Sequence, residues 1–317
     1  MKIENDKQSL IRFADKLGFD VGENVIQNVE VHFQKTFNFL PDLAVFIASY
    51  VVKKTFTRYT TPPKLIKDNI RFFFHNVFDG NKQTNGKRKA KTQEKMPYVR
   101  VFPSALSYES LFTKNSHIKV VSVIISSDYL KSFLKQDAQR FQFLFDSNTD
   151  FLIEEIMTED ILRTVNDIVK EEEPRPLRSY HYKLKALELL FYLFQSLSKR
   201  ENAVHQKLKQ KDIKSIYKVR DKIALSLNKP SSIEDLKQIA GMNELKMRKL
   251  FTQVFGMRIY DYYQYLRMNE AARLLREEKL SVSEAGYKMG FENLSHFTRV
   301  FEKHIGKKPK KYSKELA

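Results

Sequence analysis

The sequence predicts two domains, an N-terminal α+β domain followed by a C-terminal all-α domain. Its 317 residues exceed the usual size of one hydrophobic core. Runs of aromatic and β-branched residues, typical of strands, recur before residue 212 and stop there. Composition changes at the same point: residues 213–317 hold 22 basic and 12 acidic side chains, whereas 20 of the 25 phenylalanines lie before residue 212.

The N-terminal part begins with a series of predicted strands. They are Val29–Phe37, Leu43–Phe56, Asn69–Phe78, Met96–Phe102 and Ile118–Ile125. Turn signals such as Asp79-Gly80 and Asn85-Gly86 separate them. The aromatic stretch Arg71–Phe78 either forms a buried strand or lines a ligand cavity. The basic segment Gly86–Lys91 is expected to be a solvated hairpin loop that could add phosphate contacts.

After Ser126 the pattern becomes helical. A capped helix is expected at 126–134, and Thr158–Lys170 has a capping-box start with apolar i, i+3, i+4 spacing. Beyond the break EEEPRP, Ser179–Leu208 predicts one long helix with a stripe formed by Leu184, Leu187, Leu190, Phe191 and Phe194. This helix is either domain core or a dimer surface, and in the second case its anchors are Tyr182, Leu189, Tyr192 and Phe194.

Seven helices with short connections are expected after the boundary. They are Asp212–Leu227, Ser232–Ala240, Asn243–Phe255, Ile259–Arg276, Val282–Met289, Asn293–His304 and Pro309–Lys314. The third and the sixth repeat each other: NELKMRKLFTQVFG and NLSHFTRVFEKHIG lie 50 residues apart, and each runs from Asn, a preferred N-cap, to Gly, a preferred helix end. A shorter helix and a tight turn precede each copy, with capping-box spacing at Ser231/Glu234 and Ser281/Glu284. The region therefore predicts two helix-turn-helix units.

Both second helices have an apolar and a polar face at 100° per residue. In the first copy Met247, Leu250, Phe251 and Val254 form the buried side, and Leu245, Arg248, Lys249 and Thr252 lie opposite. In the second copy Phe297, Val300, Phe301 and Ile305 form the buried side, and Ser295, Thr298 and Arg299 face away, with His296 on a flank. Such polar, cationic faces fit a DNA major groove. Ile259–Arg276 has apolar residues on several faces, which predicts a buried helix that holds the two units apart.

The region 213–317 resembles the DNA-binding domain of AraC/XylS-type transcription regulators. The resemblance rests on IAGMNELKMRKLFTQVFGM, YLRMNEAARLL and VSEAGYKMGFENLSHFTRVFEKHIGKKPKKY. Two departures occur: Gly286 lies in EAGYKMGF, where the family usually has Ile-Ala, and Glu302 stands where a basic residue is usual. The N-terminal part resembles the family's regulatory domains more weakly; these are often cupin-like β-barrels followed by dimerising helices.

The resemblance implies promoter DNA as partner and places base-facing positions on both helices. In this sequence they are Leu245, Lys246, Arg248, Lys249, Leu294, Ser295, His296, Thr298 and Arg299. The domains expected are 1–178, a β-rich regulatory and ligand-binding domain; 179–212, a dimerisation and linker helix; and 213–317, the double helix-turn-helix domain. The protein is then an activator that reads two successive major grooves through helices 243–255 and 293–304. RNA polymerase, a small-molecule effector and a second copy of the chain are its further expected partners.

Composition limits the kinds of partner and of chemistry that the chain can have. The net charge of +18 points to a polyanionic partner, and the absence of cysteine excludes thiolate catalysis and cysteine-ligated zinc. The seven histidines show no metal-ligand spacing, and no nucleotide-binding or nucleophile motif occurs, so no catalytic residue, metal or cofactor is expected. No apolar run is long enough for a membrane span, and the chain is expected in the bacterial cytoplasm, on the nucleoid. The rival hypotheses are a DNA-tethered enzyme and an architectural protein that binds DNA without sequence preference.

Overall fold

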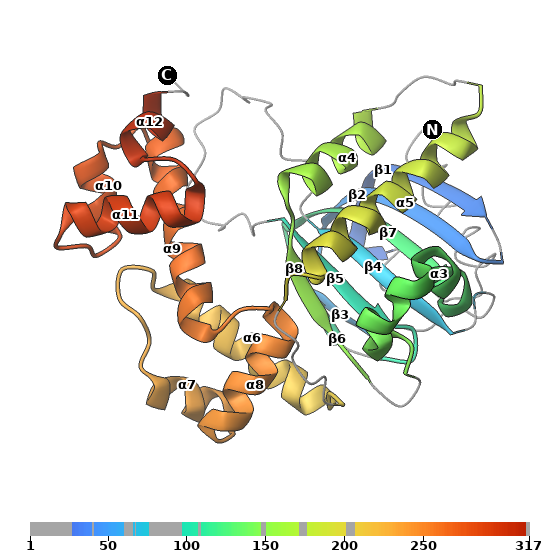
Figure 1. Ribbon diagram of the computed structural model, residues 1–317, viewed down its shortest axis with the longest axis horizontal. Helices are drawn as coiled ribbons and strands as arrows, with labels where there is room; N and C mark the ends of the chain where they lie inside the picture. Colours follow the sequence, from blue (N-terminus) through green and yellow to red (C-terminus); the bar gives the residue numbers. More distant parts are fainter. Residues whose placement is uncertain are drawn as a thin grey trace. The chain divides into compact units, whose positions relative to one another are not determined.

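The computed structural model describes residues 27–39, 41–59, 66, 68–75, 97–106, 109–146, 150–170, 176–200 and 207–314 (Figure 1). The chain divides into two compact units, Met1–Leu208 and Lys209–Ala317. In the described residues no helix combines the length and the apolar character needed to span a lipid bilayer. The predicted loop Gly86–Lys91 and its Asn-Gly turn lie outside the described residues.

Unit 1 is built on a six-stranded antiparallel sheet in the order β1-β2-β7-β4-β5-β8, and β3 pairs with β6 in a second, two-stranded sheet. The strands are β1 Val29–Phe39, β2 Leu43–Val52, β3 Phe56–Tyr59, β4 Asn69–His75, β5 Tyr98–Pro103, β6 Glu109–Phe112, β7 His117–Ser126 and β8 Ile153–Ile156. Within the described residues no pairing joins the edge strands β1 and β8. The sheet is therefore open there, and the expected cupin-like barrel is not formed by these strands.

One face of the large sheet carries the core of unit 1. Because side chains alternate along a strand, Phe72 and Phe74 of β4 share a face with Val121 and Val123 of the neighbouring β7, and all four are fully buried. The helices α3 (Ser127–Leu134), α4 (Glu159–Lys170) and α5 (Arg178–Leu197), with a 3-10 helix at Lys135–Leu144, cover this face (Figure 1). In its described part, the aromatic stretch around Phe72 is thus a buried central strand.

Helix α5 corrects two expectations. It ends at Leu197 instead of continuing to Leu208. Just beyond, the Arg200 guanidinium reaches β8, where Nη2 lies 2.6 Å from Glu155 Oε2. The helix is also rotated relative to the predicted stripe: Leu190 and Phe194 are buried, whereas Leu184 and Phe191 are 66% and 54% exposed.

The predicted dimer anchors on α5 lie on its inner side. Tyr182 and Leu189 are fully buried, Phe194 is 5% exposed, and Tyr192 is half-buried against the same core. Tyr182 stacks on Phe37 of β1 with ring centroids 3.6 Å apart. These side chains hold the helix on its own sheet and cannot also anchor a second subunit, so this prediction of anchors is wrong.

Unit 2 consists of helices throughout its described residues, and all seven predicted helices form. They are α6 Gln210–Leu225, α7 Ile233–Ala240, α8 Glu244–Phe255, α9 Ile259–Arg276, α10 Val282–Lys288, α11 Leu294–Ile305 and α12 Pro309–Lys314. As expected from its apolar residues, α9 is buried on several sides, and it contacts the helices of both halves of the unit (Figure 1). Met268, Ala271 and Leu274 of α9 join Phe297 and Phe301 of α11 in one core.

Candidate nucleic-acid interface

Helices α8 and α11 begin and end in the same way. The side chain of Asn243 accepts a hydrogen bond from Lys246 N at 2.9 Å, and that of Asn293 accepts from Ser295 N at 2.9 Å and His296 N at 3.0 Å. Each helix is 12 residues long and stops at a left-handed glycine, Gly256 at φ 67° or Gly306 at φ 79°. The caps predicted from the sequence repeat are confirmed at both helices.

The repeat extends beyond these helices into the following ones. Phe251 of α8 meets Tyr262 of α9 edge-on at 5.4 Å, and Phe301 of α11 meets Tyr312 of α12 edge-on at 5.7 Å. Both residues of the second pair lie 50 positions after those of the first. The start of α12 therefore has the same relation to α11 as the start of α9 has to α8.

The helices that precede α8 and α11 are capped by serines, one of them displaced from its predicted position. At α10 the Ser281 hydroxyl accepts from Glu284 N, and Glu284 Oε2 accepts from Ser281 N, which confirms the predicted capping box. At α7 the cap is Ser232, whose hydroxyl accepts from Asp235 N at 3.1 Å. The predicted pairing of Ser231 with Glu234 is therefore wrong by one residue.

The turn between α10 and α11 is held by residues that lie outside the second helix-turn-helix unit. Arg267 of α9, 8% exposed, donates from Nε to the carbonyl oxygen of Met289 at 2.7 Å and lies 3.6 Å from the ring centroid of Phe291. Gly290 has a φ of 74°, and a Cβ built on it would lie 2.0 Å from the carbonyl oxygen of Asn228. Only glycine fits this approach.

The outer face of α8 carries the four residues predicted for the first unit. Leu245 is 66% exposed, and Lys246, Arg248 and Lys249 are exposed. Opposite them, Met247, Leu250, Phe251 and Val254 are at most 2% exposed, as predicted. The exposed side is therefore cationic with one large apolar side chain.

The outer face of α11 carries most of the residues predicted for the second unit. Ser295, His296 and Arg299 are exposed, and Thr298 is half-buried. Leu294 differs, because it is half-buried and its Cδ2 would lie 2.8 Å from a Cβ at position 286. Leu294 thus packs against α10, and this contact gives Gly286 a packing reason: a side chain there would displace Leu294.

Two of the predicted reading cations are already paired within unit 2. Lys246 Nζ lies 2.8 Å from Asp212 Oδ1 in the first turn of α6, and Arg248 Nε lies 2.7 Å from Glu244 Oε1 one turn earlier on α8. Among the described residues no carboxylate pairs with Lys249 or Arg299. The two helix-turn-helix units thus differ in how many cations on their outer faces already pair with a carboxylate before any ligand binds.

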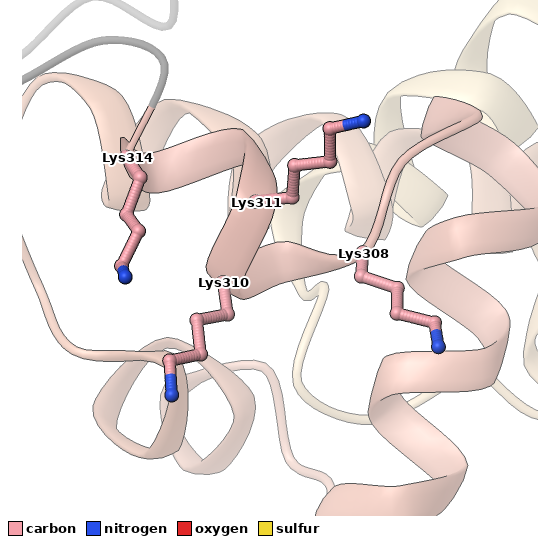
Figure 2. A pocket seen from close by; sticks show the side chains of 4 residues that line it. All are labelled: Lys308, Lys310, Lys311 and Lys314. Carbon is pink, nitrogen blue, oxygen red and sulfur yellow. The ribbon is translucent and has the colours of Figure 1, made fainter.

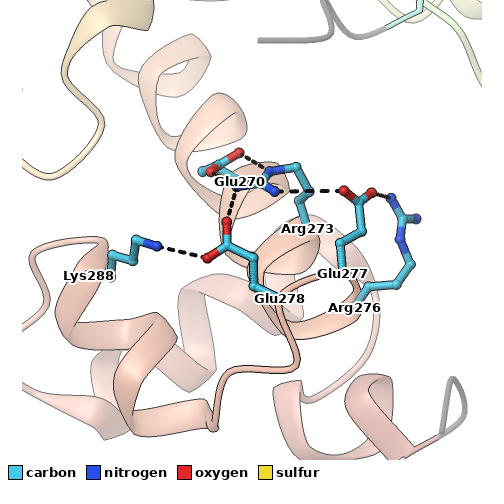
Figure 3. Close-up of polar contacts among 6 residues, drawn as sticks. All are labelled: Glu270, Arg273, Arg276, Glu277, Glu278 and Lys288. Carbon is cyan, nitrogen blue, oxygen red and sulfur yellow. Dashed lines mark hydrogen bonds and ion pairs between the residues drawn. The ribbon is translucent and has the colours of Figure 1, made fainter. Parts of the chain in front are cut away.

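A charged network holds the connection between α9 and α10 (Figure 3). Arg273 of α9 lies 2.7 Å from Glu270 and 2.8 Å from Glu278, and Lys288 of α10 lies 2.9 Å from Glu278 on its other side. Lys288 and Arg273 hold the pKa of the Glu278 carboxyl below its usual value, and the two carboxylates raise the pKa of Arg273. The network ties the second helix-turn-helix unit to the helix that links it to the first.

Sequence reasoning missed the buried and paired members of this site. The partner of Arg248, Glu244, stands four residues earlier and could have been found from helical spacing. Asp212 is 34 residues from Lys246, and Arg267 is 22 residues from Met289, so only the folded chain shows these contacts. No group of three or more histidine, aspartate or glutamate side chains suited to hold a metal occurs in the described part of the chain.

Known proteins match the C-terminal unit of the chain. A family model described as a helix-turn-helix domain matches residues 236–315. The regulatory protein PchR of Pseudomonas aeruginosa is 32% identical over 108 residues, 34% of this chain and 36% of PchR. The transcriptional activator RhaR of Klebsiella pneumoniae is 32% identical over 87 residues, 27% of this chain and 31% of RhaR. The matches therefore span about a third of each of these relatives.

Solved structures also match part of the chain. An AraC-type transcriptional regulator from Chromobacterium violaceum is 24% identical, with a TM-score of 0.32, and covers 33% of this chain and 94% of its own. The relatives are named as regulators, which agrees with the prediction that the chain is not an enzyme. With its two capped helix-turn-helix units and these sequence relatives, the C-terminal unit of this chain is an AraC-type helix-turn-helix domain.

Proposed function

We propose that the protein is a sequence-specific, DNA-binding transcription regulator. The observation that carries this proposal is the pair of helices α8 and α11, which share their caps and their flanking aromatic contacts and each expose a polar, cationic face. Two equivalent helices joined by one buried helix form a device that reads two successive major grooves. DNA binding would also place the protein on the bacterial nucleoid.

The exposed residues supply chemistry suited to base edges. Arg299 and Lys249 can donate to guanine, Ser295 can donate or accept, and the exposed Leu245 can contact a thymine methyl group. Lys246 and Arg248 can contribute only after leaving or sharing Asp212 and Glu244. The second helix-turn-helix unit therefore has fewer internal ion pairs to break when it binds DNA.

The test uses Arg299→Ala in the full chain and a duplex that the wild-type protein selects from a random library. We expect a loss of about 1–3 kcal/mol in binding and relaxed preference at one base pair, because a bidentate base contact is removed. Binding to the selected duplex and to all of its single-base variants measures both. Arg276→Ala is the matched control, since Arg276 is an exposed arginine at the end of α9 and is not one of the residues proposed to contact bases.

Two outcomes would contradict the proposal. If Arg299→Ala changes neither affinity nor base preference, α11 does not read the groove through this face. If the wild-type protein binds selected and random duplexes equally at fixed salt, the architectural alternative holds. Turnover of a substrate by unit 1 would instead support a DNA-tethered enzyme.

Unit 1 is proposed to regulate DNA binding through dimerisation and through a small-molecule effector. Support for a dimer comes from the outer side of α5, where Leu177, Tyr180, Leu184 and Phe191 are between 54% and 73% exposed. Their spacing of three, four and seven residues is that of a coiled-coil seam. This exposed stripe replaces the buried anchors predicted from the sequence.

Sedimentation equilibrium of the full chain tests the dimer. We expect the wild type to be dimeric and Leu184→Lys with Phe191→Lys to be monomeric, since two charges would enter the apolar seam. Gln136→Lys with Gln139→Lys, both exposed on the 3-10 helix Lys135–Leu144 and not on α5, is the control and should stay dimeric. A monomeric wild type, or a dimeric double variant, would remove this part of the proposal.

Activation is the proposed sign of regulation, acting through RNA polymerase at the promoter. Its support is the similarity to RhaR, which is named a transcriptional activator. Transcription in vitro from a promoter that carries the selected duplex tests it: added protein should raise transcript yield, and a fall would make the protein a repressor.

A further inference from the structure

Four lysines gather around a hollow at the end of the second helix-turn-helix unit. Lys308 precedes α12, and Lys310, Lys311 and Lys314 lie on it (Figure 2). The hollow that they line has a volume of about 450 Å³. Lys310 and Lys314 point to one side of α12, and Lys311 points to the other.

This lysine cluster is not neutralised within the described residues. All four side chains are exposed, and no described carboxylate pairs with any of them. Elsewhere in unit 2, cations such as Lys237, Lys246 and Lys288 each have a carboxylate within 3 Å. Four like charges held on so short a segment repel one another, and an anionic ligand with several charges would relieve that repulsion.

The internal repeat indicates where that ligand lies. Lys308 and Lys310 stand 50 residues after Arg258 and Tyr260, which are exposed at the start of α9. The matching contacts of Tyr262 with Phe251 and of Tyr312 with Phe301 place both segments directly behind the end of a reading helix. A reading helix leaves the major groove at the sugar-phosphate backbone, so the segment after it lies beside phosphates.

We propose that the lysine cluster binds backbone phosphates of the DNA next to the groove read by α11. This inference rests on the proposed function and adds to it an interaction that gives affinity without sequence preference. It also assigns a role to a dense part of the C-terminal charge that lies outside the two reading faces. The first copy of the repeat has Asp261 where this cluster has Lys311, so the two ends of the site are expected to hold DNA with unequal strength.

The experiment measures binding of the full chain to the selected duplex and to a random duplex over a range of salt concentrations. The variant replaces Lys308, Lys310, Lys311 and Lys314 with glutamine. We expect the slope of log K against log salt to become shallower by about 0.9 for each phosphate that the variant no longer neutralises, equally on both duplexes. The ratio of the two affinities should stay unchanged, in contrast to Arg299→Ala, which should change it.

A control variant removes the same number of charges from α6 and the loop after it, through Lys211→Gln, Lys218→Gln, Lys222→Gln and Lys229→Gln, all exposed. An equal decrease of slope in this control would show a general effect of net charge and would overturn the proposal.

An unchanged slope in the cluster variant would overturn the proposal too. Reduced transcription with intact DNA binding would then assign the lysine cluster to an acidic protein partner. If the wild type binds no duplex, the proposed function fails, and this inference fails with it. Thermal unfolding checks that both variants fold, and the pair Lys310→Gln and Lys314→Gln serves if the fourfold variant does not.

Discussion

The buried guanidinium of Arg267 holds the turn between α10 and α11 in place. It satisfies the carbonyl oxygen of Met289 and rests on the ring of Phe291, so a residue of the linking helix holds two residues of the turn that orients α11. Burial lowers the pKa of this guanidinium, but an arginine remains charged at neutral pH despite such a shift. Its charge is therefore stabilised by the carbonyl dipole and the two aromatic rings beside it, those of Phe291 and Tyr263.

Replacing Arg267 with methionine should destabilise unit 2 by about 2–4 kcal/mol. The change keeps most of the side-chain volume, leaves the Met289 carbonyl without its donor and removes the cation–π interaction. Urea unfolding of the full chain, followed by a probe in unit 2, measures the destabilisation. Arg276→Met, at an exposed position of the same helix, is the control and should change stability by less than about 0.5 kcal/mol. A similar small effect for both variants would show that the turn is held by other groups.

Some helices have bounds that follow from their own sequence, and others have bounds that depend on packing against the rest of the fold. Four helices of unit 2, α7, α8, α10 and α11, begin at an asparagine or serine cap, and α7, α8 and α11 also end at a left-handed glycine, so short-range signals set them. Helix α5 lacks such a cap, since Leu177 at its start has no side-chain hydrogen bond, and Arg200 just after its last turn is tied to β8. Its length and rotation consequently depend on the sheet beneath it.

The link between α9 and α10 should weaken in acid through Glu278. Lys288 and Arg273 lower the folded-state pKa of this carboxyl from its ordinary 4.5. The carboxylate then stabilises the fold fully above the unfolded pKa, and this contribution disappears as pH falls through the folded pKa. Unfolding of the wild type and of Glu278→Gln between pH 7 and pH 3 checks it: the variant should be less stable at pH 7, and the two should converge in acid. A constant difference across this range would contradict the assignment.

The whole of unit 2 depends on one rigid spacer. Helix α9 has 18 residues, a length of about 27 Å, and its buried faces contact the helices of both halves. Over residues 209–314, which the structure describes throughout, the connections on either side of α9 are short, at Gly256–Arg258 and Glu277–Ser281, and the charged network holds the second. The distance between the outer faces of α8 and α11 is therefore a property of the fold.

Inserting base pairs between the two half-sites of the selected duplex should abolish joint binding. Both a 5-bp and a 10-bp insertion are expected to reduce affinity to that for a duplex with one half-site, because α9 cannot lengthen to follow a half-site moved by about 34 Å. Equilibrium binding to the two duplexes measures this, and the same insertions placed outside the half-sites are the controls. Recovery with the 10-bp insertion alone would show a flexible connection between the units.

The C-terminal unit is largely predictable because its signals are local and repeated. Caps, glycine ends and a 50-residue period determine the helices within one or two residues, and they determine which side of α8 and α11 is polar. The family resemblance, and not these signals, places Leu294 among the base-facing positions, and its packing against Gly286 on another helix is a tertiary contact. Five strands of unit 1, namely β1, β2, β4, β5 and β7, are also predictable, since their runs of apolar residues are local. The short strands β3, β6 and β8 and the order β1-β2-β7-β4-β5-β8 are not.

By itself, the sequence determined the two-part organisation, the helices of unit 2, the polar and cationic faces of α8 and α11, and the excess of positive charge. Only the tertiary structure decided that the large sheet is open in its described part, that Tyr182, Leu189 and Phe194 are core, and that Lys246 and Arg248 are paired before DNA binds. The physical reason is the range of the interactions. Caps and helical periodicity act over a few residues, whereas burial, strand pairing and ion pairs such as Lys246 with Asp212 join residues far apart in the chain, which only folding brings together.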